Sequence, residues 1–138
     1  MPFDALFDLD LPVTPDPRRA TRGLANYHSG MAAESVVAHR YQARGDRIAA
    51  RRWRGSRGEL DLVVQGQDGL LVFVEVKHAR NHDLAACRVS RAQLGRLVRT
   101  SEEYRARQHG TLDVDMRFDL ALVDAMGRIE VIENAFFE

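Results

Sequence analysis

The sequence predicts a single α/β domain in which helices flank a central mixed β-sheet, with the element order α-β-β-β-α-β-β. The length of 138 residues suits one domain with one hydrophobic core. Hydrophobic residues make up 45% of the chain and charged residues 29%, as in soluble globular proteins. Two stretches show the helical spacing of apolar residues, and five short stretches show the pattern of strands. No apolar run approaches the ~20 residues of a membrane span, so we expect no membrane partner.

Residues 1–20 hold all four prolines of the chain: Pro2, Pro12, Pro15 and Pro17. Prolines at this density favour an extended arm over regular structure. The folded domain is therefore expected to cover residues 21–138.

The first predicted helix runs from Ser29 to Gly45. Serine is a favoured N-cap residue, and glycine is favoured just after a helix ends. The apolar residues between them follow helical spacing, at Ala33, Val36, Val37 and Tyr41. Glu34 borders this stripe, so we expect it at the edge of the buried face.

Three strands follow, at residues 47–53, 59–65 and 70–77. A loop containing Gly55, Ser56 and Gly58 separates the first two. The segment Gly66-Gln67-Asp68-Gly69 between the last two is typical of a β-hairpin.

A second helix is predicted from Arg91 to Gln108, with Ser90 as its cap and Gly110 as its stop. Its apolar stripe consists of Leu94, Leu97, Val98 and Tyr104. Two further strands fit residues 116–123 and 128–134, with a turn at Met126-Gly127.

The hairpin brings two carboxylates together. Side chains alternate along a strand, so Asp61 should share a face with Glu59 and Val63, and Glu75 should share a face with Lys77. The remaining residues of the second strand are expected in the core: Leu60, Leu62 and Val64. If the hairpin loop has an odd number of residues centred on Asp68, Asp61 lies opposite Glu75. A two-residue loop would put Asp61 opposite Val74 or Val76, whose side chains point to the other face of the sheet. We therefore predict an odd loop or a bulge.

Two directly opposed carboxylates repel each other, so something must neutralise them. A shared proton, an arginine or a divalent cation could each do so. The oxygen donors and the lack of a cysteine cluster favour Mg²⁺ or Mn²⁺ over zinc, with the carbonyl of Val76 as an extra ligand. Mg²⁺ commonly binds phosphate oxygens of a substrate as well.

Lys77 is the only lysine, against nineteen arginines. A lysine is a compact ammonium on a flexible stem, whereas arginine is a permanently charged planar fork. One lysine beside Asp61 and Glu75 is typical of a site that orients a water or stabilises charge at a phosphate. Chance in an arginine-rich composition is the alternative.

Asp61 followed by Glu75-Val76-Lys77 resembles the PD-(D/E)XK nuclease signature. Over residues 23–135, four ordered motifs resemble the YraN-like family, which is grouped with Holliday-junction-resolvase-type endonucleases. The motifs are Gly30-x-x-Ala33-Glu34, Gly58-Glu59-Leu60-Asp61-Leu62-Val63, Val72-Phe73-Val74-Glu75-Val76-Lys77 and Arg117-Phe118-Asp119.

The resemblance implies a restriction-endonuclease-like fold in which Asp61 and Glu75 hold the metal, Lys77 is catalytic and Glu34 is an accessory carboxylate. The chain departs from the family pattern in two places. Ala79 stands where a basic residue is usual, and Arg91-Ala92-Gln93 opens the second helix where a lysine is usual. Gln93 either faces the site or is polar surface.

Several other residues have two interpretations. Glu59 is a further ligand or, as we favour, a surface charge at the strand end. Glu34 pairs with Arg40 or Arg52, or joins the metal site. Trp53 is expected in the core rather than stacked on a base, and Asp119 is expected to be structural. His78 and His82 are expected in a loop, because no four-ligand zinc set accompanies them.

Charge is unevenly distributed although the net charge is zero. Residues 18–57 carry ten arginines against two acids, whereas the segments on either side are acidic. Such a basic segment favours a nucleic-acid partner, bound through phosphates. The candidate contacts are Arg44, Arg51, Arg52, Arg54 and Arg57, and a merely solvated face is the alternative.

These observations favour a Mg²⁺-dependent endonuclease that hydrolyses phosphodiester bonds in DNA, with branched DNA as one candidate substrate. A non-catalytic nucleic-acid-binding protein of the same fold is the alternative, and a protein-interaction module is the third. A homodimer would let two sites cut a junction symmetrically, but the sequence marks no dimer face.

The single cysteine, Cys87, cannot form an internal disulfide and fits a reducing cytoplasm.

Overall fold

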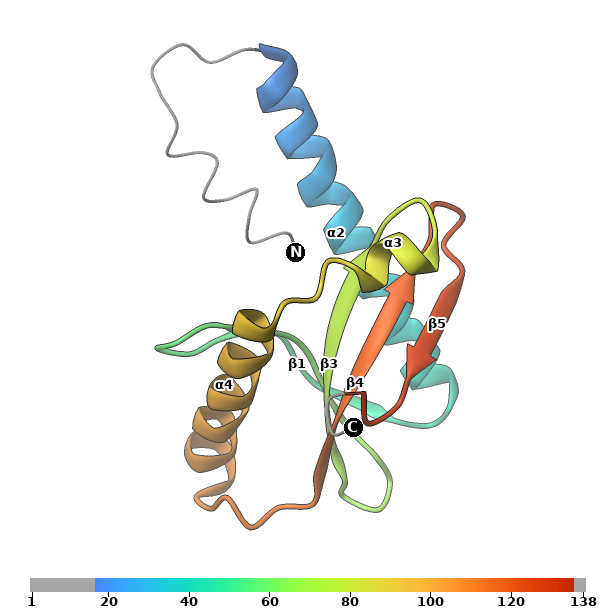
Figure 1. Cartoon of the computed structure of the whole chain (residues 1–138). Coiled ribbons are helices and arrows are strands. Elements are labelled where there is room, and N and C mark those ends of the chain that lie inside the picture. The colour runs from blue at the N-terminus through green and yellow to red at the C-terminus, as the bar shows by residue number, and fades with distance from the viewer. Residues whose placement is uncertain (1–16, 136–138) are drawn as a thin grey trace.

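The computed structural model describes residues 17–135, with side chains from residue 30 onward. It contains one five-stranded mixed sheet with helices on its faces, which confirms the predicted fold class (Figure 1). The elements in chain order are α2 (Pro17–Ala43), β1 (Arg47–Arg54), β2 (Glu59–Gln65), β3 (Leu71–His78), α3 (His82–Ala86), α4 (Arg91–His109), β4 (Met116–Val123) and β5 (Ile129–Ile132). Strand boundaries agree with the predicted ones to within two residues.

Helix α2 begins at Pro17, well before the predicted start at Ser29. Proline is tolerated in the first turn of a helix, where its missing N–H has no intrahelical partner. Ser29 is therefore an interior residue, and residues 17–20 of the predicted arm are helical, while residues 1–16 lie outside the described part. The predicted end is confirmed: Gly45 has φ +93° just after the helix, and its N–H donates to the carbonyl of Gln42.

The β2–β3 hairpin has the predicted register. Leu62 pairs with Val74, and Gln65 pairs with Leu71, which leaves the five-residue loop 66–70 centred on Asp68. The Asp68 carboxylate accepts a hydrogen bond from the N–H of Leu70 and stabilises this loop. The odd loop therefore sets the register in which Asp61 comes next to Glu75.

The sheet is mixed because β3 and β4 run parallel, whereas the other neighbouring pairs are antiparallel. The crossover between β3 and β4 contains α4, whose N-cap Ser90 and C-terminal Gly110 were both predicted. Ser90 and Gln93 form a capping box, and Gly110 has φ +72°. The crossover also contains α3, a five-residue helix capped by Asn81, in the segment predicted to be a loop around His82.

Helices α2 and α4 cover opposite faces of the sheet (Figure 1). The α2-facing core includes Tyr41, Leu62, Val74 and Ala121. The α4-facing core includes Val63, Phe73, Leu97, Tyr104 and Phe118. A third, smaller cluster lies under α3. Among residues 17–135, no helix has the length and hydrophobicity of a membrane span.

Candidate active site

Strands β2 and β3 separate at Asp61. Their backbone pairing ends at Leu62 opposite Val74. The next pair would be Asp61 opposite Glu75. Beyond that point the N–H of Val76 donates to Oδ2 of Asp61, at 2.9 Å. A side chain thus replaces a backbone acceptor, and the Asp61 carboxylate lies across the gap between the two strands.

The strands lose their regular alternation at the same place. In β2, Leu60 and Val63 both pack in the α4-facing core, although residues three apart should face opposite sides. In β1, Ala49, Ala50 and Trp53 all pack against this core, and the β1–β2 register shifts between Ile48 and Ala50. The prediction that Leu60 shares a face with Leu62 and Val64 is therefore wrong. The irregularity coincides with Asp61, whose carboxylate accepts the hydrogen bond from the backbone of β3.

Arg52 lies directly across from Asp61, between the pairs Arg51–Leu62 and Trp53–Leu60. Its φ of +49° is unusual for a residue other than glycine. The left-handed backbone at Arg52 marks the shift of alternation in β1. Strained conformations of this kind cluster at functional sites, and this one adjoins the acidic pair.

Asp61, Glu75 and Lys77 come together as the sequence predicted. The ammonium of Lys77 lies 3.2 Å from Oε1 of Glu75. The side chains of Lys77 and Glu75 are only 4% and 14% exposed, and Asp61 is buried as well. The cluster therefore has little water to screen its charges.

Burial and crowding change the acidity of Glu75. Burial, the charge of Asp61 and a hydrogen bond between the two carboxyl groups raise the pKa of Glu75, and the Lys77 ammonium lowers it. The net effect is a pKa raised to about 8. Near neutral pH the pair therefore retains a proton. A shared proton was one of the three ways of neutralisation expected from the sequence.

Glu34 lies beside this cluster but is held by Arg52. Nε and Nη2 of Arg52 lie 2.8 and 3.3 Å from the two carboxylate oxygens of Glu34. The expected default pairing with Arg52 is thus confirmed. Burial raises the pKa of Glu34, the hydrogen bond from Arg52 lowers it, and the charge of Asp61 raises it. Glu34 is therefore close enough to sense Asp61, and its accessory role stays a prediction.

A recess opens from Glu75 toward α4. Its lining residues come from the end of the β1–β2 loop, the two site strands and one face of α4: Gly58, Glu59, Glu75, Gln93, Arg96, Leu97 and Thr100. Gln93, Arg96 and Thr100 lie three and four residues apart, so they share a helix face. Helical spacing from Gln93 could have identified Arg96 and Thr100, which sequence reasoning missed.

The β1–β2 loop is fastened to α4 beside this recess. The Glu103 carboxylate accepts hydrogen bonds from the N–H and the hydroxyl of Ser56, at 2.8 and 2.9 Å. A Cβ at Gly58 would lie 3.0 Å from Oγ1 of Thr100. Glycine at this position therefore allows the close approach of loop and helix that shapes the recess.

Glu59 and Gln93 both line the recess, and each has a second role. Glu59 lies 3.4 Å from Arg54, and its side chain is 15% exposed. It is therefore more enclosed than the surface charge that the sequence favoured. The side-chain oxygen of Gln93 accepts from the N–H of Ser90 in the capping box of α4.

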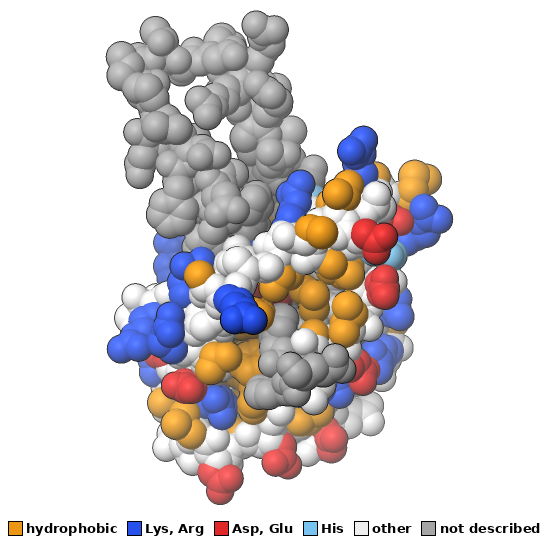
Figure 2. Space-filling model, viewed as in Figure 1, with side chains coloured by type: hydrophobic (Ala, Val, Ile, Leu, Met, Phe, Trp, Pro, Cys, Tyr) orange, Lys and Arg blue, Asp and Glu red, His pale blue; other side chains and the backbone are white. Residues whose placement is uncertain are grey.

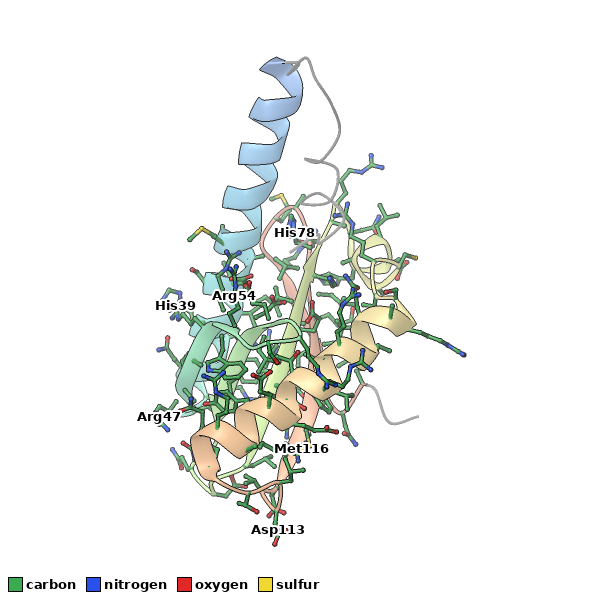
Figure 3. The ribbon with its side chains drawn as sticks, turned by 90° about the vertical axis from the view of Figure 1, so that its left-hand side faces the viewer. His39, Arg47, Arg54, His78, Asp113 and Met116 are labelled. Carbon is green, nitrogen blue, oxygen red and sulfur yellow. The ribbon has the colours of Figure 1, made fainter. Side chains whose placement is uncertain are left out.

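Carboxylates in the fold pair with three of the five arginines predicted to contact nucleic acid. Arg44 pairs with Glu133, Arg52 with Glu34 and Arg54 with Glu59. The other two are Arg51 and Arg57, whose side chains are exposed. Figure 3 shows Arg54 and Arg47 at opposite ends of β1, so this arginine run is spread along the whole strand.

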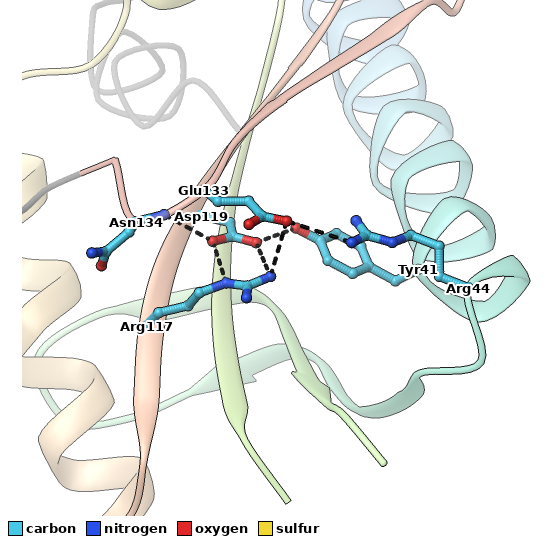
Figure 4. Close-up of polar contacts among 6 residues, drawn as sticks. All are labelled: Tyr41, Arg44, Arg117, Asp119, Glu133 and Asn134. Carbon is cyan, nitrogen blue, oxygen red and sulfur yellow. Dashed lines mark hydrogen bonds and ion pairs between the residues drawn. The ribbon is translucent and has the colours of Figure 1, made fainter. Parts of the chain in front are cut away.

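Asp119 is structural, as predicted. It is fully buried, and its carboxylate accepts hydrogen bonds from the Tyr41 hydroxyl, Nε of Arg117 and the N–H of Asn134, at 2.7, 2.9 and 3.2 Å (Figure 4). Arg117 and Arg44 also contact Glu133. The network ties α2 to β4 and to the chain after β5.

Trp53 belongs to the core, as predicted, because its ring packs edge-on against Tyr104 with a centroid distance of 5.2 Å.

His78 ends β3, and its buried Nε2 has no hydrogen-bond partner among the described residues. His82 lies in α3, where Nδ1 is 3.2 Å from Glu130 and Nε2 is 2.9 Å from the carbonyl of Arg128. These contacts hold the crossover against the β4–β5 turn.

The sequence profile of the family described as "Uncharacterised protein family UPF0102" matches residues 33–123. The chain belongs to this family. UPF0102 is the YraN family, so the resemblance seen in the four motifs is confirmed. The profile covers Glu34, Asp61, Glu75 and Lys77 together.

Relatives that match over most of their length carry the same family name. A UPF0102 protein of Roseobacter denitrificans is 45% identical over 120 residues, which cover 87% of this chain and 92% of the relative. One from Cereibacter sphaeroides strain KD131 is 45% identical over 83% of this chain and 97% of its own length. One from Ruegeria pomeroyi is 44% identical over 85% of this chain and 94% of its own length. These names give the family but no activity.

Proposed function

We propose that this UPF0102 protein is a metal-dependent endonuclease that hydrolyses phosphodiester bonds in DNA. One observation carries the proposal: Asp61, Glu75 and Lys77 form a single buried cluster where two strands separate. A fold gains no stability from crowding two buried carboxylates, so the cluster is better explained by chemistry than by packing.

The residues of this cluster fit Mg²⁺ or Mn²⁺. Among the described residues, no group of three His, Cys, Asp or Glu side chains is placed to hold a metal ion. The donors on offer are the carboxylates of Asp61 and Glu75 and the backbone carbonyl of Val76. Such a small oxygen set suits Mg²⁺, which usually takes one or two carboxylates and completes its shell with waters and substrate phosphates. The raised pKa of Glu75 supports the fit, because a cation between the carboxylates would favour their charged forms.

The bound ion would supply Lewis-acid activation of the phosphate and would lower the pKa of an attacking water. The chain supplies the rest. Lys77 is held by Glu75 in a buried position, where its ammonium would orient the water or stabilise the charge that develops on the phosphate. Gln93 and Arg96 line the recess from α4 and would position the substrate strand.

The test is cleavage of linear, nicked, single-stranded and four-way-junction DNA with Mg²⁺ or Mn²⁺. Wild type should cut at least one substrate, and Lys77→Ala should lower the rate by about a hundredfold or more, as expected when a transition-state donor is lost. Glu102→Gln, on the exposed side of α4, is the control and should cut like wild type. Equal cutting by wild type and Lys77→Ala would reveal a contaminating nuclease and contradict the proposal.

Metal binding is measured separately, by calorimetric titration with Mn²⁺. Asp61→Asn should abolish binding, whereas Glu102→Gln should retain it. Salt-sensitive DNA binding without cleavage, unaffected by Lys77→Ala, would instead identify a non-catalytic nucleic-acid-binding protein. The pairing of Glu34 with Arg52 favours that alternative, because it engages the third carboxylate near the site.

A further inference from the structure

Arg96 lines the recess, and three further arginines are exposed on the same two segments. Arg91, Arg96 and Arg99 belong to the first half of α4, and Arg57 belongs to the β1–β2 loop. We infer that this surface, the α4 basic face, is where the phosphate backbone of a DNA strand docks. The inference rests on the proposed function. Of the contacts predicted from the sequence it keeps Arg57, and it replaces those in and before β1 with arginines of α4.

The α4 basic face adjoins the acidic cluster. Arg96 lines the recess together with Glu75, and a Cβ at Gly58, next to Arg57 in the chain, would lie 4.0 Å from Cβ of Arg96. The Ser56–Glu103 hydrogen bonds hold the loop against the helix. In Figure 2, Lys and Arg side chains gather where Figure 1 places the β1–β2 loop and the start of α4. A strand bound there would pass directly over the recess.

The distribution of charge along α4 is unfavourable for the helix alone. Its first turn contains no acidic residue, and Arg91, Arg96 and Arg99 precede the first acids of the helix, Glu102 and Glu103. The amino-terminal end of a helix carries partial positive charge that falls off within the first turn, so Arg91 is repelled there and anions are attracted. A polyanion would relieve this repulsion and gain from the helix dipole at once.

Three arginines of the α4 basic face also differ from Arg44, Arg47 and Arg54 in their partners. The side chains of Arg57, Arg91 and Arg99 are exposed, and no hydrogen bond or ion pair to another described residue is recorded for them. Near β1, by contrast, Arg44 and Arg54 pair with Glu133 and Glu59, and Arg47 donates to Gln65. Binding phosphate at Arg57, Arg91 and Arg99 therefore breaks fewer of the fold's own contacts than binding it at Arg44, Arg47 or Arg54.

The experiment compares two triple variants with the same charge change. The test variant is Arg57→Gln/Arg91→Gln/Arg99→Gln, and the control variant is Arg40→Gln/Arg47→Gln/Arg128→Gln, all at exposed positions. Binding to a fluorescein-labelled DNA duplex is followed by anisotropy in EDTA over a range of salt concentrations. EDTA excludes metal and cleavage, so the result does not depend on catalysis.

The test variant should weaken binding by about tenfold or more and reduce the slope of log K against log salt by about 2–3, because each phosphate contact contributes about 0.9 to that slope. The control variant should change the slope by less than about 1. Equal losses in both variants, or no binding by wild type, would overturn the inference. So would a larger loss in Arg44→Gln/Arg51→Gln, which would return the contacts to the β1 side.

The two proposals fail separately. Binding that depends on the α4 basic face, with no cleavage of any substrate, would leave the docking surface standing and remove the nuclease. Cleavage that needs Lys77, with binding unaffected by the test variant, would leave the nuclease standing and remove the docking surface.

Discussion

Tyr41→Phe removes one hydroxyl from the buried network around Asp119, and its effect can be worked out from the contacts. The hydroxyl donates to Oδ2 of Asp119 at 2.7 Å, and both residues are fully buried. Burial and the charge of Asp119 raise the pKa of Tyr41, so the phenol stays neutral and remains a donor. A hydrogen bond to a charged acceptor contributes about 1.5–3 kcal/mol. Arg117 still pairs with Asp119 in the variant, so we expect a loss of about 2 kcal/mol, within that range.

The assay is urea denaturation at pH 7, with the free energy of unfolding taken from the midpoint and the m-value. Tyr104→Phe is the matched control. Tyr104 is also buried, at 5% exposure, but no hydrogen bond from its hydroxyl is recorded among residues 17–135. We expect it to change stability by less than about 0.5 kcal/mol, because no buried acceptor loses its donor. Equal losses in the two variants would refute the reasoning, since the shared effect would then be the loss of a phenol rather than of a specific bond.

Two further perturbations probe the site itself. Because the folded state raises the pKa of Glu75 from 4.5 to about 8, the folded protein binds more protons than the unfolded chain in this range, and stability falls as pH rises through it. In metal-free buffer Glu75→Gln should remove this pH dependence of the free energy of unfolding, which amounts to a few kcal/mol at about 1.4 kcal/mol per pH unit. The control Glu102→Gln should keep it. Identical pH profiles for Glu75→Gln and wild type would contradict the raised pKa. Gly58→Ala places a Cβ 3.0 Å from Oγ1 of Thr100 and should destabilise by about 1 kcal/mol. The penalty should shrink when Thr100→Ala is added, as a double-mutant cycle measures, and strictly additive losses would show that the contact does not matter.

The turn residues at 66–69 predicted the hairpin, but its register followed only from the further condition that Asp61 face Glu75. Given that condition, the side-chain period of two requires an odd loop or a bulge. The ends of α4 were predictable from local chemistry alone, since Ser90 and Gly110 act within one turn of the helix. Where one short segment contains all the determinants, the sequence is sufficient.

Other features depend on contacts that the sequence does not order. Residues 17–28 lack a clear apolar stripe and begin with proline, so nothing marked the early start of α2. Helix α3 has only five residues, too few for periodicity to appear. The partner of Glu34 was left open between Arg40 and Arg52, because the choice depends on how β1 lies beside α2.

The most informative failure concerns Leu60. Regular alternation assigned it to the α2 side, but the strand changes face between Leu60 and Val63, opposite the left-handed backbone of Arg52. The irregularity lies where the Asp61 carboxylate accepts the N–H of Val76, next to Glu75 and Lys77. Sequence rules describe unstrained structure, so they should fail first where a fold departs from regularity to build a site. In this chain the departure coincides with the acidic pair of Asp61 and Glu75.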